Sequence, residues 1–164
     1  MKKLAFIPTR EDTPPPILSK FLESAGWKVV LLSNYDSIFN AFSKGVKEHN
    51  VLAGDFVIFC HDDIEILTNE ENFNFFIDPL SGMVMHGDKR EKMHVNFYGA
   101  YGDVVVLDGL FLAAKGSTIN TINLTKPSFF SGDWDFYDIY YTTQTFLKGK
   151  KNRTFPTQLI LWVI

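Results

Sequence analysis

Three short apolar segments that alternate with helical patterns place the strongest constraint on the fold. The segments span 4–7, 27–32 and 55–60, and their centres are almost entirely apolar. Such continuous apolar strands are typical of a sheet that is covered on both faces. Apolar residues recur at helical spacing over 17–25 and again over 38–46. The alternation predicts an α/β fold in which helices cover both faces of a mainly parallel sheet.

Prolines, glycines and small polar residues are expected to mark the ends of these helices. The prolines at 14–16 suit the entry to the first helix, because the N–H groups that they lack would be unpaired there. Gly26 suits the end of that helix, and Asp36 or Ser37 can cap the start of the next one.

The second half of the chain gives a weaker pattern. Strands are predicted at 83–85, 103–107, 111–114 and 154–164. Asp108 and Gly109 form a turn dipeptide, after which the strand at 111–114 either continues or reverses the one before it. A helix is predicted over 138–147, with Gly149 at its end.

Length, composition and charge exclude several classes of protein. A chain of 164 residues suggests one domain, 1–164, and its 46% hydrophobic and 21% charged residues are ordinary for a folded protein. The net charge of −3 gives no electrostatic signal for nucleic acid binding. Cys60 is the single cysteine, which excludes an internal disulfide and fits a reducing compartment.

The apolar segments are too short to suggest a membrane protein. None is long enough to cross a bilayer. The basic start at 1–3 resembles the beginning of a signal peptide, but the apolar stretch 4–7 that follows is too short for one. A cytoplasmic location is therefore expected. The apolar tail could form a contact in a homo-oligomer, although a buried strand explains it as well.

The third apolar strand ends in His61, Asp62 and Asp63, which are the strongest candidates for chemistry. Ligands of open α/β sheets bind at the carboxyl ends of the strands. Two carboxylates and an imidazole there suit Mg²⁺ or Mn²⁺ with a phosphate-bearing substrate. Capping of a following turn, or simple exposure to solvent, is the alternative. The chain lacks the glycine-rich motifs of dinucleotide-dependent oxidoreductases and P-loop NTPases.

Three segments in order resemble the family-2-like glycosyltransferases with the GT-A fold, which transfer sugars from nucleotide-diphosphate donors. The first segment is 37–42 together with 55–66, which holds the strand and its His-Asp-Asp end. The second is 106–113, with Asp108 and Gly109, and the third is the helix start Phe136-Tyr137-Asp138-Ile139, followed by Gly149 and Pro156. The resemblance implies a GT-A-like, Rossmann-like three-layer sandwich around a mainly parallel mixed sheet.

The resemblance implies a donor site with a divalent cation, Mn²⁺ or Mg²⁺, on the diphosphate of a UDP- or GDP-linked sugar. His61 stands where the family's Asp-x-Asp motif has its first Asp, so Asp63 and His61 are the expected metal ligands. Asp62 would lie near the ribose or the metal. The loops after the first two strands would contact base, ribose and phosphate through Pro8, Thr9, Arg10, Asn34 and Asp36. Turn chemistry or capping explains these loop residues equally well.

The resemblance also implies a carboxylate that accepts the proton of the acceptor hydroxyl. Asp138 matches the family's acidic position at a helix start, and Asp135 is the second candidate for this base. A cap of the helix is an equally good reading of Asp138, and both roles can coexist.

The acceptor is expected to be a hydroxyl-bearing molecule, a glycan. Four residues are candidates to bind it. These acceptor-binding candidates are Asp108, Gly109, Trp134 and Tyr137. Trp134 could offer a flat apolar face to a sugar ring. The neighbouring phenylalanines Phe129, Phe130 and Phe136 are expected to be core residues instead.

The chain departs from the family pattern in two places. Tyr140 stands where a second acid is usual, and Trp162 lies near the position at which many members bring a histidine to the metal. The resemblance predicts a metal-assisted, inverting glycosyltransferase. Because of the departures, the alternative is a catalytically impaired module that binds a nucleotide or glycan. A nucleotidyltransferase is a weaker third interpretation, because it should have more basic residues around a triphosphate.

Overall fold

The computed structural model describes residues 1–9, 15–77, 84–86, 102–107, 109–155 and 160–162. Fourteen elements are present in these parts of the chain. In order they are β1 (Lys3–Pro8), α1 (Pro16–Ser24), β2 (Lys28–Leu32), α2 (Ile38–Glu48), β3 (Phe56–Cys60), β4 (Ile64–Ile66), α3 (Glu70–Phe76), β5 (Val84–His86), β6 (Gly102–Val104), β7 (Phe111–Lys115), α4 (Gly116–Ile119), α5 (Tyr137–Leu147), β8 (Asn152–Phe155) and β9 (Ile160–Trp162).

Seven of the strands form one mixed sheet in the order β2-β1-β3-β7-β5-β8-β6. The pairs β1–β2, β1–β3 and β5–β8 are parallel, whereas β3–β7, β5–β7 and β6–β8 are antiparallel. β4 and β9 form a separate antiparallel ribbon. The part of the sheet built from the three apolar strands is thus parallel, as expected, and antiparallel pairs extend it.

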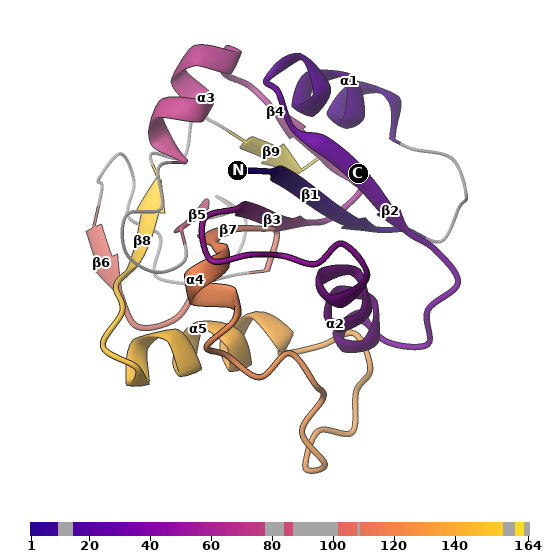
Figure 1. The fold of residues 1–164 in the computed structure, drawn as a ribbon, viewed down its shortest axis with the longest axis vertical. Coiled ribbons are helices and arrows are strands. Elements are labelled where there is room, and N and C mark those ends of the chain that lie inside the picture. Colours follow the sequence, from indigo (N-terminus) through magenta and orange to yellow (C-terminus); the bar gives the residue numbers. More distant parts are fainter. Residues whose placement is uncertain (10–14, 78–83, 87–101, 108, 156–159, 163–164) are drawn as a thin grey trace.

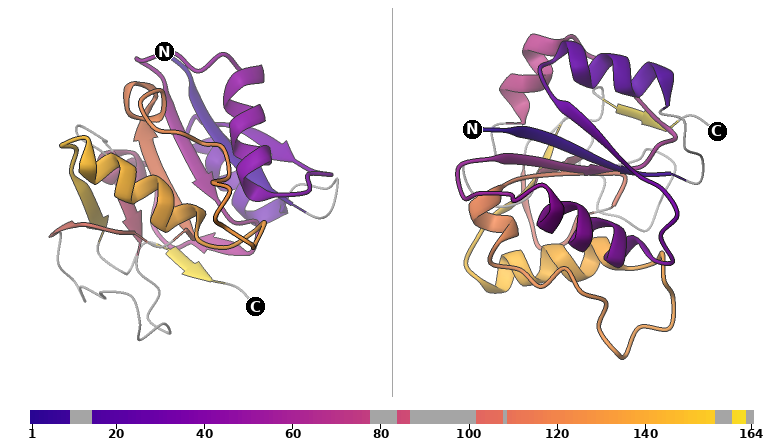
Figure 2. Two further views of the ribbon diagram at one scale, coloured as in Figure 1. Left: turned by 90° about the horizontal axis from the view of Figure 1, so that it is seen from below. Right: turned by 45° about the vertical axis from the view of Figure 1, so that its right-hand side comes forward.

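Helices lie on both faces of the sheet, which gives three layers. Figure 1 and Figure 2 show α1 and α3 on one face, and α2, α4 and α5 on the other. Neighbouring residues of one strand pack on opposite faces of the sheet, because strand side chains alternate in direction. Phe6 and Phe59 pack into the cluster under α2 and α5, whereas Ile7 and Ile58 pack into the cluster under α1 and α3. The predicted three-layer α/β fold is confirmed.

Local signals in the sequence set the helix ends as predicted. Pro16 is the first residue of α1, and Gly26 follows that helix with a φ of 84°, a left-handed conformation that glycine adopts without strain. Ser37 caps α2, since its hydroxyl oxygen accepts a hydrogen bond from the backbone N–H of Asn40. Gly149, with a φ of 73°, follows the end of α5.

The strand predicted over 103–107 is wrong beyond Val104. β6 ends there, and Val105 and Val106 are 50% and 37% exposed. The reason is the choice of partner, because β6 pairs with β8 at the edge of the sheet and the chain then turns toward α5. There the N–H of Leu107 donates to the Thr142 hydroxyl at 3.3 Å. β7 pairs with β3 and β5, so it neither continues nor hairpins back on β6.

The predicted tail strand, 154–164, is also corrected. Its described residues belong to two strands in two sheets, β8 beside β5 and β6, and β9 beside β4. The strand predicted at 83–85 is described from Val84 onward, as β5. Among the described residues, no helix combines the length and the apolar character needed to cross a membrane.

Candidate functional site

The carboxyl ends of β1, β2 and β3 meet at one edge of the sheet. Pro8 at the end of β1 pairs with Leu32 at the end of β2, and Phe6 pairs with Phe59 near the end of β3. The loops that leave this edge carry Thr9, Asn34 and the His61–Asp63 segment. The parallel register thereby brings together three of the predicted contact regions, as expected for an open α/β sheet.

His61 is fixed at this edge by its backbone and by its side chain. Its N–H donates to the carbonyl of Leu110 at 3.1 Å, which continues the ladder between β3 and β7. Its Nε2 lies 3.0 Å from the hydroxyl oxygen of Tyr137, the first residue of α5. The Tyr137 hydroxyl in turn donates to the carbonyl of Gly109. The end of β3, the turn before β7 and the start of α5 are therefore joined at one point.

Gly109 has no room for a side chain. A Cβ at this position would overlap the hydroxyl and the ring carbons of Tyr137. Tyr137 itself is 3% exposed, so its ring fills the space that Gly109 leaves. Both residues were predicted to bind an acceptor, and in the structure they contact each other inside the fold. Acceptor contact by either stays a prediction.

Asp63 and His61 stand close enough to share a ligand. Nδ1 of His61 lies 3.8 Å from Oδ1 of Asp63, and the side chains are 38% and 43% exposed. Mg²⁺ and Mn²⁺ commonly take only one or two protein ligands and complete their shell with water and phosphate oxygens. The two donors fit such a cation. No set of three or more His, Cys, Asp and Glu side chains able to hold a metal occurs in the described ranges.

The thiol that precedes His61 takes no part in this chemistry. Cys60 is fully buried, and burial, with a smaller contribution from the negative charge of Asp62, raises the pKa of its thiol well above the usual range. The thiolate, which is the reactive form, is therefore suppressed. Asp62 is half-buried beside this thiol.

The predicted donor-contact residues are placed at the ends of the first two strands. Pro8 and Thr9 are buried, and the Thr9 N–H donates to the carbonyl of Leu32 at 3.2 Å. Asn34 is exposed and has a φ of 60°, a turn conformation that asparagine tolerates. Arg10, predicted to contact phosphate, lies outside the described residues, as does Asp108, predicted to contact the acceptor.

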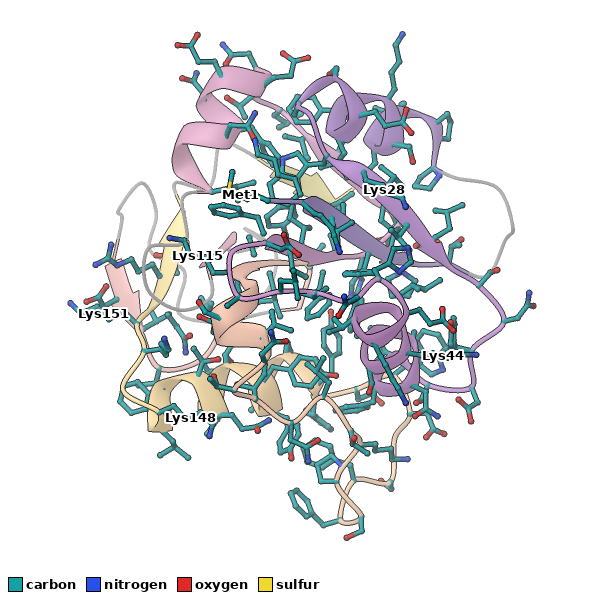
Figure 3. The ribbon with its side chains drawn as sticks, in the orientation of Figure 1. Met1, Lys28, Lys44, Lys115, Lys148 and Lys151 are labelled. Atoms are coloured by element: carbon teal, nitrogen blue, oxygen red, sulfur yellow. The ribbon has the colours of Figure 1, made fainter. Side chains whose placement is uncertain are left out.

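Asp36 lines a pocket of about 390 Å³ beside the carboxyl end of β2. The pocket is lined by Tyr35, Asp36, Asn40, Ser43, Lys44 and Lys47. The Asn40 side-chain amide donates to the Asp36 carboxylate at 2.8 Å, and this hydrogen bond lowers the pKa of Asp36. Lys44, labelled on α2 in Figure 3, holds its ammonium 5.4 Å from the Tyr35 ring. The pocket thus combines an ionised carboxylate with two lysines.

The start of α5 carries both candidates for the general base. The N–H of Ile139 donates to a carboxylate oxygen of Asp138 at 2.7 Å, so Asp138 occupies one backbone donor in the first turn of α5. A carboxylate has two oxygens and about four lone-pair positions, so capping does not consume its capacity to accept a proton. Asp135 is exposed three residues earlier. Which of the two is a base stays a prediction.

Phe136, between these two acids, has an unfavourable conformation. Its φ of 60° lies in the left-handed region, which bulky residues rarely adopt, and its side chain is 59% exposed. A strained backbone of this kind costs about 1–3 kcal/mol and clusters at functional sites. The left-handed conformation of Phe136 turns the backbone into the start of α5.

Aromatic side chains project from the loop that precedes α5. Trp134 is 46% exposed and Phe129 is 76% exposed. The prediction that Phe129 and Phe136 are core residues is therefore wrong, whereas Phe130 packs against the core as expected. Phe130 contacts Phe39 and Tyr140 at centroid distances of 6.1 and 5.8 Å, whereas Phe129 and Phe136 stay at the surface. Figure 1 shows this loop extending away from the sheet between α2 and α5.

Two contacts fix this aromatic loop against the rest of the molecule. The Ile38 N–H, at the start of α2, donates to the carbonyl of Asp133 at 3.0 Å. The Lys126 ammonium pairs with the Asp133 carboxylate at 2.5 Å. Trp134, the predicted acceptor platform, follows Asp133 directly in the chain.

Sequence reasoning missed two long-range relationships at the site. The Tyr137–His61 contact joins positions 76 residues apart, and the Asp-Gly dipeptide that accommodates it signalled only a turn. The second is the return of β9, in which Trp162 pairs with Ile64 directly after Asp63. The apolar tail signalled a strand without its partner.

Comparison with known proteins finds similar structures but no similar sequence. No family model matches the chain, and no curated protein sequence matches it. Among solved structures, A197 from STIV shares the fold with a TM-score of 0.66 and 16% identity, over 100% of this chain and 86% of that one. S. aureus TarS 1–349 matches with a TM-score of 0.61 and 13% identity, over 99% of this chain and 60% of that one.

One of the matching structures contains a nucleotide sugar. S. aureus TarS 1–349 in complex with UDP-GlcNAc matches with a TM-score of 0.59 and 14% identity. The match covers 100% of this chain and 59% of TarS 1–349, so this chain spans less than two thirds of that protein. At this identity the likeness establishes the fold alone. The chain therefore has a GT-A-like α/β fold.

Proposed function

We propose that the chain is a glycosyltransferase that moves a sugar from a nucleotide-diphosphate donor to a hydroxyl acceptor. The observation that carries this proposal is the pair of His61 and Asp63 at the carboxyl edge of the sheet, with Nδ1 and Oδ1 3.8 Å apart. Structural likeness to TarS, a protein solved with UDP-GlcNAc, supports a nucleotide sugar as the donor.

His61 and Asp63 would hold the divalent cation, Mn²⁺ or Mg²⁺, on the donor diphosphate. When bound, the cation neutralises charge that builds on the departing nucleoside diphosphate. The half-exposed side chains leave coordination positions for phosphate oxygens and water. Asp62, half-buried next to them, adds negative charge that favours a cation at this edge.

The nucleoside of the donor, UDP or GDP, would lie over the ends of β1 and β2. Asp36 lines the pocket there, and its ionised carboxylate can accept hydrogen bonds from ribose hydroxyl groups. Asn34 and Thr9 border the same edge of the sheet.

The acceptor would approach from the side of α5. Its hydroxyl oxygen forms a bond to the anomeric carbon, the bond from that carbon to the diphosphate oxygen breaks, and the hydroxyl proton passes to Asp138. Asp138 suits this role because Tyr137, its neighbour, contacts His61 and holds the helix start at the cation site. Attack opposite the departing diphosphate inverts the anomeric carbon. Trp134 would stack on a sugar ring of the acceptor.

Calorimetry with UDP and with GDP, each with and without Mn²⁺, tests the donor site. We expect the wild type to bind one of the two nucleotides, and to bind it tightly only when Mn²⁺ is present. Asp63→Asn should remove this metal dependence, because the amide replaces a charged ligand by a neutral one. Asp103→Asn is the matched control, since Asp103 is similarly exposed but pairs with Lys151 and Arg153 on the β6–β8 edge. Unchanged metal dependence in Asp63→Asn would contradict the proposal.

A binding module of the same fold is the second candidate, and Tyr140 favours it. Tyr140 occupies the position of the family's second acid, and its ring packs on Phe39 and Phe130 at 6.2 and 5.8 Å. The residue is thus used for packing. Release of free sugar from a panel of UDP- and GDP-sugars distinguishes the candidates, because a binding module would bind a donor without turnover.

A further inference from the structure

The hydroxyl of Tyr137 is engaged by two groups at once. It donates to the carbonyl of Gly109 and lies 3.0 Å from Nε2 of His61. The hydroxyl has one proton, and a carbonyl oxygen can only accept. The proton of Tyr137 therefore belongs to the Gly109 bond.

This use of the proton determines the tautomer of His61. Since the Tyr137 proton points to Gly109, the hydroxyl oxygen can only accept from His61, so Nε2 must carry a hydrogen. A neutral imidazole has one N–H and one lone pair. The lone pair is then on Nδ1, the atom that faces Asp63 at 3.8 Å.

We propose that Tyr137 is a positioning residue that holds His61 as the Nε2–H tautomer and turns the Nδ1 lone pair toward the cation shared with Asp63. The cation part of this inference rests on the proposed function. Metal-binding histidines generally need a second group on their other ring nitrogen, which fixes the tautomer and the ring orientation. Here a buried tyrosine supplies that group in place of a carboxylate or backbone carbonyl.

The surroundings make the device rigid. Tyr137 is 3% exposed, and its ring contacts Phe42 and Tyr141 with centroid distances of 5.6 and 5.9 Å. The His61 ring stacks on that of Tyr137 at 6.3 Å with an interplanar angle of 30°. Because Gly109 has no Cβ, the Tyr137 hydroxyl can reach the Gly109 carbonyl. The tyrosine side of this hydrogen bond is therefore held by the core.

Nitrogen NMR of the histidine rings in the metal-free protein tests the tautomer directly, at a pH at which the imidazoles are neutral. The His61 signals are identified by their absence in His61→Gln. Wild type should show the Nε2–H form, and Tyr137→Phe should show a mixture of both tautomers. Tyr141→Phe is the matched control, because its buried hydroxyl also donates to a carbonyl, that of Leu124 at 2.9 Å, without touching His61. It should keep the Nε2–H form.

An Nδ1–H form in the wild type, or the same tautomer in wild type and Tyr137→Phe, overturns the inference. Binding of Mn²⁺, followed by the loss of its free electron paramagnetic resonance signal, tests the consequence. Tyr137→Phe should bind Mn²⁺ about 10- to 100-fold more weakly than Tyr141→Phe. Equal affinities would overturn the positioning role. Absence of Mn²⁺ binding in the wild type overturns the proposed cation site, while the NMR result still decides the tautomer.

Discussion

Gly109 lies against the hydroxyl of Tyr137 so closely that no side chain fits between them. The two residues come from the turn before β7 and from the first turn of α5, 28 positions apart. Their approach joins the two halves of the candidate site.

Gly109→Ala should therefore displace the Tyr137 ring and destabilise the fold by about 1–3 kcal/mol, the usual cost of overpacking a buried position. Urea unfolding measures the change. Gly54→Ala is the control, because a Cβ at Gly54 meets nothing within 4 Å and a surface change of this kind is worth less than about 0.5 kcal/mol. Equal unfolding midpoints for the two variants would show that the ring has room to move.

A second prediction concerns Asp55, a buried carboxylate that closes the start of β3. Its two oxygens accept from the backbone N–H groups of Lys2 and Leu52 at 2.7 and 2.9 Å. These hydrogen bonds, with that of Leu52 the larger, hold the pKa of Asp55 below its ordinary value of 3.8. The carboxylate therefore stabilises the fold fully above about pH 3.8. The contribution is lost as the pH falls below that value through the lower folded pKa.

Asp55→Asn should remove this dependence, because an amide does not titrate and can offer only one acceptor oxygen. We expect a loss of about 1–3 kcal/mol at pH 7, from the backbone donor left unpaired, and a shallower fall in stability as the pH drops below about 3.8. Urea unfolding at a series of pH values measures both. The assignment fails if the variant and the wild type lose stability in parallel over the acid range.

Much of the fold could be predicted because its first half is specified locally. The apolar run 4–7 and the helical spacing of Ile38, Phe39 and Phe42 each indicate their own structure without reference to other segments. Ser37 and Gly26 mark helix ends through their own backbone chemistry. The strand-end position of His61–Asp63 followed from the same reasoning.

The rest depends on partners that no local pattern names. The valines at 104–106 favour a strand, yet only Val104 finds one, because β8 ends its pairing there. The apolar character of Trp162 predicts a strand but does not say which strand it pairs with. Its pairing with Ile64 depends on tertiary packing. The Tyr137–His61 contact likewise needs both the helix start and the strand end in place before it exists.

A third prediction concerns the exposed ring of Trp134. If this ring stacks on a sugar of the acceptor, Trp134→Ala should raise the KM for the acceptor roughly 5- to 10-fold, which corresponds to about 1 kcal/mol of stacking. The KM for the donor should not change. Phe129→Ala, on the same loop and 76% exposed, is the control and should leave both constants near those of the wild type. A larger effect of Phe129→Ala would assign the platform to Phe129 instead.

The last prediction tests the base. Asp138→Asn keeps the size of the side chain and the oxygen that accepts the Ile139 N–H, but it cannot take up the acceptor proton. Turnover should therefore fall about 10²- to 10⁴-fold, the usual contribution of a general base. The affinity for nucleotide and Mn²⁺ should be unchanged, because Asp138 is not among the residues assigned to the donor.

Stability separates this role from capping. As a cap alone, the carboxylate near the start of α5 is worth about 0.3–1 kcal/mol, so Asp138→Asn should shift the unfolding midpoint only slightly while turnover collapses. Asp135→Asn is made in parallel, since Asp135 lies three residues earlier and exposed. If Asp135→Asn loses the greater part of the activity, the base is Asp135. If neither variant loses activity, proton transfer to a carboxylate of this segment is excluded, and the acceptor must be activated elsewhere.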